Sequence, residues 1–191
     1  MASPMIRRLR CEVFDEGRHL HRLQDFDCGE EDYQREISEW IRNSTADCVL
    51  DDLKARPDLQ IWVYFLKKTV VGFGSLVLAE WELRRDGEKK SKVPVILIPN
   101  VGLSREFHGQ PRDAKDKFDR YSSRILDDLT AKAKARKPKR RWLGLFVHPA
   151  NKGAIRLYER HAFTRVDDIV YKHPDFKIEY PAMILDLDAI E

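Results

Sequence analysis

Residues 142–163, W-L-G-L-F-V-H-P-A-N-K-G-A-I-R-L-Y-E-R-H-A-F, predict a β-strand that passes directly into an α-helix. The first six residues are apolar or aromatic and have the length of a strand. Pro149 stops that strand and suits the opening turn of a helix, because its fixed φ is helical and its missing N–H is not needed there. The chain must therefore adopt a fold in which a strand and a helix follow each other without a loop of any length.

The helix has one apolar stripe with two polar side chains at its edge. On a helical wheel Ala150, Ala154 and Leu157 share one face. Asn151 and Tyr158 are seven residues apart, so they lie within about 20° of each other beside that stripe. A tyrosine in this position is usually part of the core edge with its hydroxyl in water, and only the surrounding pattern favours a functional hydroxyl.

The pattern N-x-x-A-x-x-L-Y-E-R-x-x-F after V-x-P resembles the last motif of the GNAT superfamily of acyl-CoA-dependent N-acyltransferases. The resemblance implies that Asn151 and Ala154 face coenzyme A. It also implies that Tyr158 acts as general acid and protonates the departing thiolate. Family members usually have Gly-Phe where this chain has Ala162 and Phe163, which is a mild departure.

Length and composition are those of one ordinary domain, predicted to span residues 1–191. Hydrophobic residues make up 42% and charged residues 35%, and no apolar run is long enough to cross a bilayer. The first residues contain no secretion signal, so we expect a cytoplasmic protein with no membrane partner. Cys11, Cys28 and Cys48 have no metal-type spacing, which favours reduced thiols over a disulfide framework or a zinc site.

The order of predicted elements indicates a GNAT-like α/β fold, with a mixed, mostly antiparallel central sheet flanked by helices. The resemblance covers most of residues 6–187. A helix that contains Trp40 should begin near Asp27 or Gly29, either of which can cap it. The predicted elements are a strand at 6–14, that helix, a short helix at 48–56, a hairpin of 61–66 and 70–79, a central strand at 93–103, a third helix from near 116–121 to 137, the strand and helix of 142–163, and a final hairpin.

The central strand is interrupted by Pro99, which cannot donate to a sheet ladder and predicts a break or bulge. The resemblance implies that the acyl-CoA cleft opens between the fourth strand, after this break, and the fifth strand at 142–147. Backbone groups of Val101 and Leu103 would then pair with the amide-bearing arm of the cofactor.

The segment after the central strand corresponds to the pyrophosphate loop of the family, R/Q-x-x-G-x-G/A, in which backbone N–H groups hold the phosphates. Gly109 lies at the offset of the first glycine, but Pro111 occupies the place of the second. A second register places Ser122 in the loop, so an insertion of roughly nine residues would separate two halves. The predicted cofactor contacts are Arg105, His108, Gly109 and Gln110 on one side and Ser122 and Ser123 on the other, with Arg112 and Arg120 as further cations. The alternative is a loop that no longer holds coenzyme A.

The resemblance implies direct transfer of an acetyl group from acetyl-CoA to a primary amine of a small molecule or protein, without a metal. A base would take the amine proton. Glu80 is the candidate for this base, with Glu82 or a chain of water molecules as alternatives. A homodimer is compatible with the sequence.

Two other functions stay open. The element F-D-C-G before the first long helix is similar to a toxin branch of the superfamily that acetylates aminoacyl-tRNA. Seven of the ten residues from Lys132 to Arg141, hereafter the basic run, are Lys or Arg; such a run usually marks a solvated helix end but would also suit tRNA. A non-catalytic acyl-CoA-binding module would explain the irregular phosphate loop.

Overall fold

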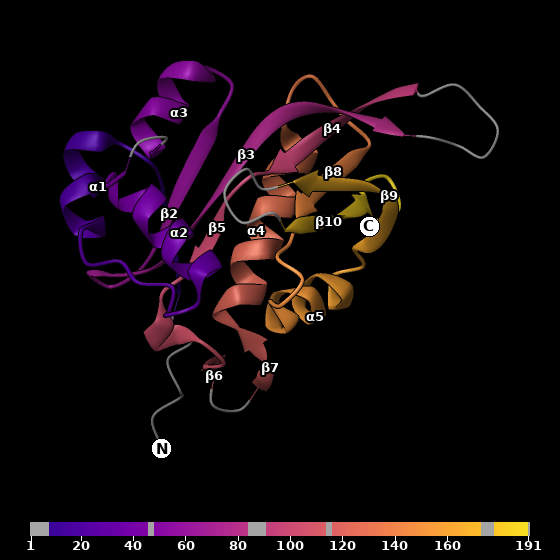
Figure 1. Cartoon of the computed structure of the whole chain (residues 1–191). Coiled ribbons are helices and arrows are strands. Elements are labelled where there is room, and N and C mark those ends of the chain that lie inside the picture. The colour runs from indigo at the N-terminus through magenta and orange to yellow at the C-terminus, as the bar shows by residue number, and fades with distance from the viewer. Residues whose placement is uncertain (1–7, 46–47, 84–90, 114–115, 173–177, 191) are drawn as a thin grey trace. The chain divides into compact units, whose positions relative to one another are not determined.

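The computed structural model describes residues 8–45, 48–83, 91–113, 116–172 and 178–190 (Figure 1). The chain forms two compact units. The first comprises the residues up to Ser75 together with Asn100–Leu129, and the second comprises Leu76–Pro99 with the residues from Thr130 onward. Strand β3 (Thr69–Leu83) and helix α4 (Tyr121–Ala135) each continue from the first unit into the second.

The first unit combines short strands with three helices. Strand β1 (Arg10–Val13) pairs antiparallel with β2 (Gln60–Leu66), β2 neighbours β3, and β5 (Val101–Leu103) pairs antiparallel with β3. Helices α1 (Glu16–Leu23), α2 (Asp32–Arg42) and α3 (Val49–Ala55) gather beside β2 (Figure 1). The rings of Phe26 and Trp40 from this helical part lie against Phe73 of β3, which helps to bury the apolar face of the strand.

Two details of these helices differ from the sequence predictions. Helix α1 was not predicted; it is short, and the side chain of Asp15 caps it by accepting a hydrogen bond from the Arg18 N–H at 3.0 Å. Helix α2 begins later than Asp27 or Gly29, because Glu31 and Gln34 form a reciprocal capping box at its start. Asp27 instead accepts a hydrogen bond from the Gly29 N–H at 2.8 Å, which closes the turn before the helix.

The predicted insertion in the phosphate loop is a small hairpin. After the 3₁₀ turn η1 (Arg105–Phe107), strands β6 (Pro111–Asp113) and β7 (Asp116–Arg120) pair antiparallel and lead directly into α4. Figure 1 shows this hairpin at the N-terminal end of α4. Helix α4 therefore starts at Tyr121, at the late end of the predicted range, because residues 116–120 are used by the hairpin.

The second unit contains the sheet that carries the strand-to-helix stretch. Its strand order is β3, β4 (Ser91–Ile98), β8 (Trp142–Phe146), β10 (Glu179–Asp186) and β9 (Thr164–Lys172). Strands β4 and β8 are parallel, whereas β3 with β4, β8 with β10 and β9 with β10 are antiparallel. The predicted mixed, mostly antiparallel sheet flanked by helices is confirmed, and helix α5 (Lys152–Arg160) lies beside β8 and β10 (Figure 1).

Strand β3 is longer than predicted, which changes the setting of the proposed base. Glu80 and Glu82 lie within the strand rather than beyond it, because β3 continues to Leu83, which pairs with Ser91 of β4. Trp81 between them packs into a core cluster, so the period-2 alternation directs the two carboxylates to the opposite face. The predicted strand ends at residue 79 because charged residues follow, but these residues are polar on one face of the strand only.

The predicted break at Pro99 is confirmed and is held by a buried serine. Strand β4 ends at Ile98 and β5 begins at Val101. Between them the Ser75 hydroxyl accepts a hydrogen bond from the Asn100 N–H at 3.1 Å and donates one to the Asn100 carbonyl at 2.9 Å. The Ser75 N–H also donates to that carbonyl at 3.0 Å. A fully buried hydroxyl thus satisfies the peptide groups that the break removes from the ladder.

Replacing Ser75 with Ala should lower the free energy of unfolding by about 1–3 kcal/mol, because Asn100 would keep polar groups without their partner. Urea unfolding followed by circular dichroism measures the loss. Ser44→Ala is the control, since the exposed Ser44 hydroxyl bonds to the Glu39 carbonyl at 3.2 Å; its cost should stay below about 0.5 kcal/mol. Equal effects of the two substitutions would show that the Ser75 hydroxyl does not hold the break.

Candidate active site

Helix α5 begins three residues later than predicted, at Lys152, because Pro149 and Ala150 form a turn before it. Asn151 is its N-cap, and the side-chain oxygen accepts a hydrogen bond from the Ala154 N–H at 3.0 Å. Just before it, the His148 ring accepts a hydrogen bond from the Ala150 N–H at 3.1 Å, which orders the turn that follows β8. The oxygen of the Asn151 amide therefore has a structural task of its own, while the NH₂ group of the same amide is a donor that capping does not use.

Tyr158 is buried in α5 and is held neutral. Only 6% of the residue is exposed, its ring lies 5.7 Å from that of Phe163, and burial raises the pKa of its hydroxyl to about 12. A phenol in this state is fully protonated at neutral pH, because water no longer stabilises the phenolate. Its hydroxyl therefore keeps a proton that it can offer to a thiolate forming beside it.

The position of the family glycine has a clear structural reason. Ala162 has a φ of 62°, in the left-handed region that favours glycine. The Ala162 N–H donates to the Glu159 carbonyl at 3.1 Å and the Phe163 N–H donates to the Tyr158 carbonyl at 3.0 Å, the two bonds of a Schellman motif that ends α5. This turn brings Phe163 back against Tyr158.

Ala162→Gly should therefore stabilise the protein by roughly 1 kcal/mol, because it removes the cost of a left-handed alanine. The measurement is the unfolding temperature by differential scanning calorimetry. Ala150→Gly serves as the matched control, since Ala150 is not among the residues with positive φ and a glycine there should give no gain. A lower unfolding temperature for Ala162→Gly would contradict the strain argument.

The parallel ladder between β4 and β8 ends at the last residue of β4. In the second unit the β4–β8 ladder ends with Ile98 opposite Leu145, and the Val147 N–H donates to the Pro181 carbonyl of β10 at 3.2 Å. In the first unit Val101 and Leu103 of β5 pair with Gly74 and Gly72 of β3. Their role in binding a cofactor arm stays a prediction.

The first half of the predicted phosphate loop is tightly turned. The Gln110 N–H donates to the Phe107 carbonyl at 3.2 Å, and the His108 ring lies 3.0 Å from the Leu103 carbonyl. Gly109 has a φ of 68°, and a Cβ placed on it would meet no atom within 4 Å, so its Cα faces open space. Glycine is needed here for the backbone conformation and leaves room for a ligand.

Arg105 is paired rather than free. Its guanidinium lies 2.6 Å from the Glu30 carboxylate, and its backbone N–H donates to the Asp27 carbonyl at 2.7 Å. Both side chains of the ion pair are more than half exposed, so water screens the attraction and the pair is weak. A phosphate could therefore compete with Glu30 for Arg105.

The second half of the loop is a helix N-terminus that suits an anion. Ser122 and Ser123 lie in the first turn of α4, where N–H groups have no partner within the helix. That turn contains no acidic residue, and Arg120 precedes it. The helix dipole and these N–H groups therefore favour a negative charge at this end.

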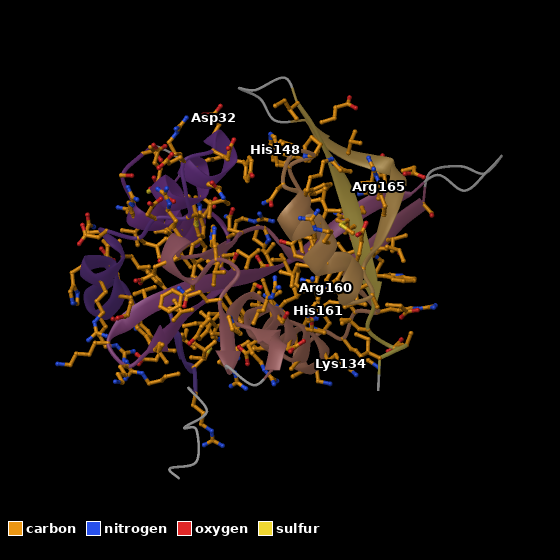
Figure 2. All side chains as sticks on the ribbon, turned by 90° about the horizontal axis from the view of Figure 1, so that it is seen from below. Asp32, Lys134, His148, Arg160, His161 and Arg165 are labelled. Carbon is orange, nitrogen blue, oxygen red and sulfur yellow. The ribbon has the colours of Figure 1, made fainter. Side chains whose placement is uncertain are left out.

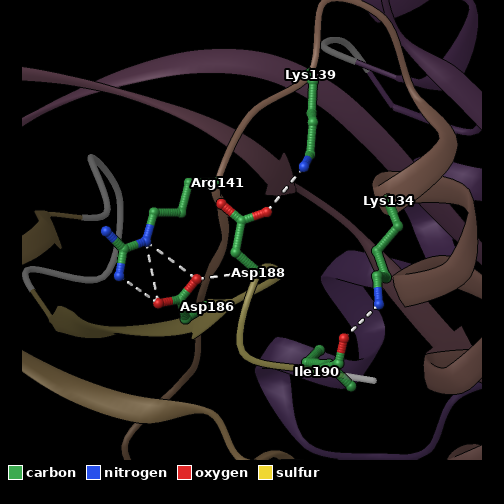
Figure 3. Close-up of polar contacts among 6 residues, drawn as sticks. All are labelled: Lys134, Lys139, Arg141, Asp186, Asp188 and Ile190. Atoms are coloured by element: carbon green, nitrogen blue, oxygen red, sulfur yellow. Dashed lines mark hydrogen bonds and ion pairs between the residues drawn. The ribbon is translucent and has the colours of Figure 1, made fainter.

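Glu80, the predicted base, and the basic run, a possible tRNA surface, are both engaged in contacts within the protein. Glu80 forms an exposed ion pair with Lys92 at 3.6 Å, so its carboxylate is hydrated rather than enclosed in a pocket. Several cations of the basic run are matched by the C-terminal segment (Figure 3). The pairs are Arg141 with Asp186 at 2.6 Å, Lys139 with Asp188 at 3.0 Å, and the Lys134 ammonium with the Ile190 carbonyl at 2.6 Å.

Two classes of site have no counterpart in the described parts of the chain. No group of three or more His, Cys, Asp or Glu side chains there could hold a metal ion, and no helix there has the length and apolar character to cross a membrane. The three cysteines, all of them described, form no disulfide.

Comparison with known proteins identifies the fold by structure, since neither a protein-family model nor a curated protein matches the sequence. A bacterial toxin shares 17% identity over 95% of this chain and 92% of its own, with a TM-score of 0.66. Arabidopsis thaliana NAA60 in complex with acetyl-CoA shares 15% identity over 95% and 100% of the chains, with a TM-score of 0.61. The toxin AtaT complexed with acetyl-methionyl-tRNAfMet shares 15% over 95% and 96%, with a TM-score of 0.55. Together with the strand order and the Asn151 to Phe163 motif, these likenesses show that the chain has the fold of the GNAT acetyltransferases.

Proposed function

We propose that the protein is an acetyl-CoA-dependent N-acetyltransferase that acts on a primary amine. A neutral amine attacks the thioester carbonyl, the C–S bond breaks, and the Tyr158 hydroxyl gives its proton to the departing thiolate. The observation that carries the proposal is a buried, protonated tyrosine on the helix that directly follows β8 in a GNAT fold. The structure of NAA60 with acetyl-CoA supports the choice of cofactor.

The residues proposed to hold coenzyme A offer three kinds of contact. The backbone around Gly109 and Gln110 and the N-terminal turn of α4 at Ser122 and Ser123 offer N–H groups to phosphates, with Arg105 and His108 nearby in the chain. Val101 and Leu103 supply backbone groups to the amide-bearing arm. Asn151 and Ala154 at the start of α5 complete the set.

The amine proton needs an acceptor. Glu80 is exposed and paired with Lys92, so it would act on an amine that reaches the open face of β3, whereas a chain of water molecules would serve an amine bound elsewhere. The acetyl acceptor is an amine of a small molecule or a protein.

Acetylation of aminoacyl-tRNA is the second candidate, because AtaT, which has a similar fold, forms a complex with acetyl-methionyl-tRNAfMet. Incubation with radiolabelled acetyl-CoA and a mixture of aminoacylated tRNAs, followed by acid precipitation, separates the two. Label in tRNA supports this candidate, and label only in small amines or peptides excludes it.

Calorimetric titration with acetyl-CoA tests the proposal first. Asn151→Ala removes both the side-chain cap and the proposed contact, whereas Asn151→Ser keeps a capping oxygen but removes the amide NH₂ group. Weaker binding by both variants supports direct contact. Weakening by Ala alone shows that Asn151 acts only as a cap, and binding without turnover of any amine would favour a non-catalytic acyl-CoA-binding module.

Gly109→Val should weaken acetyl-CoA binding by about tenfold or more, the loss of one hydrogen bond to a charged group. Gly109→Asn is the matched variant, because asparagine tolerates a positive φ whereas valine does not. If the conformation alone matters, Asn retains the native affinity in the same titration. If the phosphate needs the open space at the Gly109 Cα, both variants lose affinity, and unchanged binding by both would remove Gly109 from the site.

A further inference from the structure

Helix α5 presents a row of three cations on its exposed side. Lys152, Arg156 and Arg160, hereafter the α5 cation row, are four residues apart and exposed. At 1.5 Å per residue neighbouring members are about 6 Å apart along the helix axis. Figure 2 shows Arg160 where α5 ends.

The α5 cation row has no counter-ion among the residues that the structure describes. None of its members lies within ion-pair distance of a described carboxylate, including Glu159, which is the only acidic residue of α5. The basic run is different, because Asp186, Asp188 and the Ile190 carbonyl engage three of its cations. Two carboxylates of the C-terminal segment thus offset part of the positive charge of the stretch that looks most basic in the sequence.

The α5 cation row brings two conflicts to the helix that carries it, although Arg160 in the last turn suits the helix dipole. Lys152 stands in the first turn, where the helix dipole favours acidic residues, and that turn contains none. The three cations follow each other at a spacing of four residues, at which like charges repel. Residues that oppose the local preferences of a helix are expected at functional sites. An anion bound along the row would relieve both the unfavourable dipole interaction and the repulsion.

We propose that the α5 cation row binds the phosphate backbone of a nucleic acid strand, with RNA as the partner. A row of regularly spaced charges, two of them arginines, fits a polymer of phosphates. The large hydrophobic residues that are exposed in the described parts of the chain, Val13, Val170 and Tyr171, are not on α5, so the surface lacks the apolar anchors that a membrane would require. Phosphate contacts carry no sequence information, so binding should be independent of sequence.

The row lies away from Tyr158 on α5, about 120–160° around the helical wheel. A bound strand would therefore not occupy the space beside the Tyr158 hydroxyl. The RNA surface is independent of the proposed acetyl transfer, and each can be tested without the other.

Fluorescence anisotropy with a labelled oligouridine RNA, without acetyl-CoA, tests the proposal between about 50 and 200 mM salt. The variant K152Q/R156Q/R160Q should bind at least about tenfold more weakly at the lowest salt. The slope of log affinity against log salt concentration should be about 2 units less steep, because each lost phosphate contact contributes about 0.7. The control K134Q/K139Q/R141Q removes the same charge from the three paired cations of the basic run and should behave like the native protein. R156K/R160K keeps the charge and should keep the slope.

An unchanged slope for K152Q/R156Q/R160Q overturns the proposal, as does a loss of binding confined to the control from the basic run. Poly-glutamate that binds as tightly as RNA, with the same dependence on the row, would assign the surface to an acidic protein instead. Thermal unfolding shows whether the variant K152Q/R156Q/R160Q is folded. The row variant should unfold at a temperature no lower than the native protein, because like-charge repulsion has been removed.

Discussion

Tyr158→Phe is expected to lower kcat for acetyl transfer by about 10²- to 10⁴-fold, the usual contribution of a positioned general acid. The affinity for acetyl-CoA should change little, because phenylalanine fills the same buried space and only the proton is lost. Steady-state kinetics with the best amine found in a screen, together with calorimetric titration of acetyl-CoA, measures the two effects. Tyr33→Phe removes a tyrosine hydroxyl from α2 and should retain native kinetics.

The pH dependence gives this prediction a second readout. The pKa of Tyr158 is about 12, above its ordinary value of about 10, because burial disfavours the phenolate. The proton needed by the thiolate is therefore present at every pH up to about 11, and kcat should not fall from loss of this proton between pH 7 and 10. By linkage, the stability that comes from burying the neutral phenol is complete below the unfolded pKa of about 10 and is lost as pH rises through about 12. A native rate for Tyr158→Phe would show that the thiolate leaves without it, and an equal loss of affinity would assign Tyr158 a structural role.

Trp81→Ala is expected to reduce the free energy of unfolding by about 3–5 kcal/mol, the largest stability effect we predict. Trp81 is 6% exposed and packs with Val95, Ile169 and Ala182, and its ring lies 5.3 Å from that of Phe146. Gly144 of β8 makes this packing possible, since a Cβ there would lie 2.3 Å from the Trp81 ring. The indole therefore occupies the space that every residue other than glycine would need.

Gly144→Ala should cost about 1–3 kcal/mol for the same reason, because the indole must shift. In the double variant the methyl group added at position 144 enters the space that the indole has left, so the combined loss should be smaller than the sum of the single losses. Chemical denaturation of the four proteins gives the coupling. Gly153→Ala, where the nearest atom would be 3.8 Å away, should cost no stability and should gain up to about 1 kcal/mol, because Gly153 is a helical residue. Additive losses at Trp81 and Gly144 would contradict the proposed packing.

Local sequence patterns predicted the elements whose signals lie within a few residues. The break at Pro99, the strand at Trp142–Phe146 and the helix that follows it each depend on one residue or on a short period. The structure contains all three, although the helix starts at Lys152 rather than at Pro149. Helix α1 was not predicted because it is short and polar. The extension of β3 was not predicted because Glu80 and Glu82 are typical of a loop. Only the buried position of Trp81 between them shows a strand with one apolar face.

Contacts between distant parts of the chain explain what the patterns could not show. The Ser75 hydroxyl has no signal in the sequence, because its partner Asn100 is 25 residues away. The sequence left a solvated helix end and an anionic partner open for the basic run, because its carboxylate partners are far away in the sequence; Arg141 and Asp186 are 45 residues apart. Asp186 accepts hydrogen bonds from Arg141, which lowers the pKa of that carboxyl, so acid should weaken this pair as pH falls through that lowered value.

The sequence by itself determined the GNAT-like fold and the positions of Asn151 and Tyr158 on one helix, because hydrophobic periodicity, a proline and a cap act over a single turn or strand. Only the tertiary structure decided the protonation state of Tyr158, the partner of Arg105 and which cations lack a described counter-ion. Burial and pairing depend on what the rest of the chain places against a side chain. A local sequence pattern carries no record of that environment.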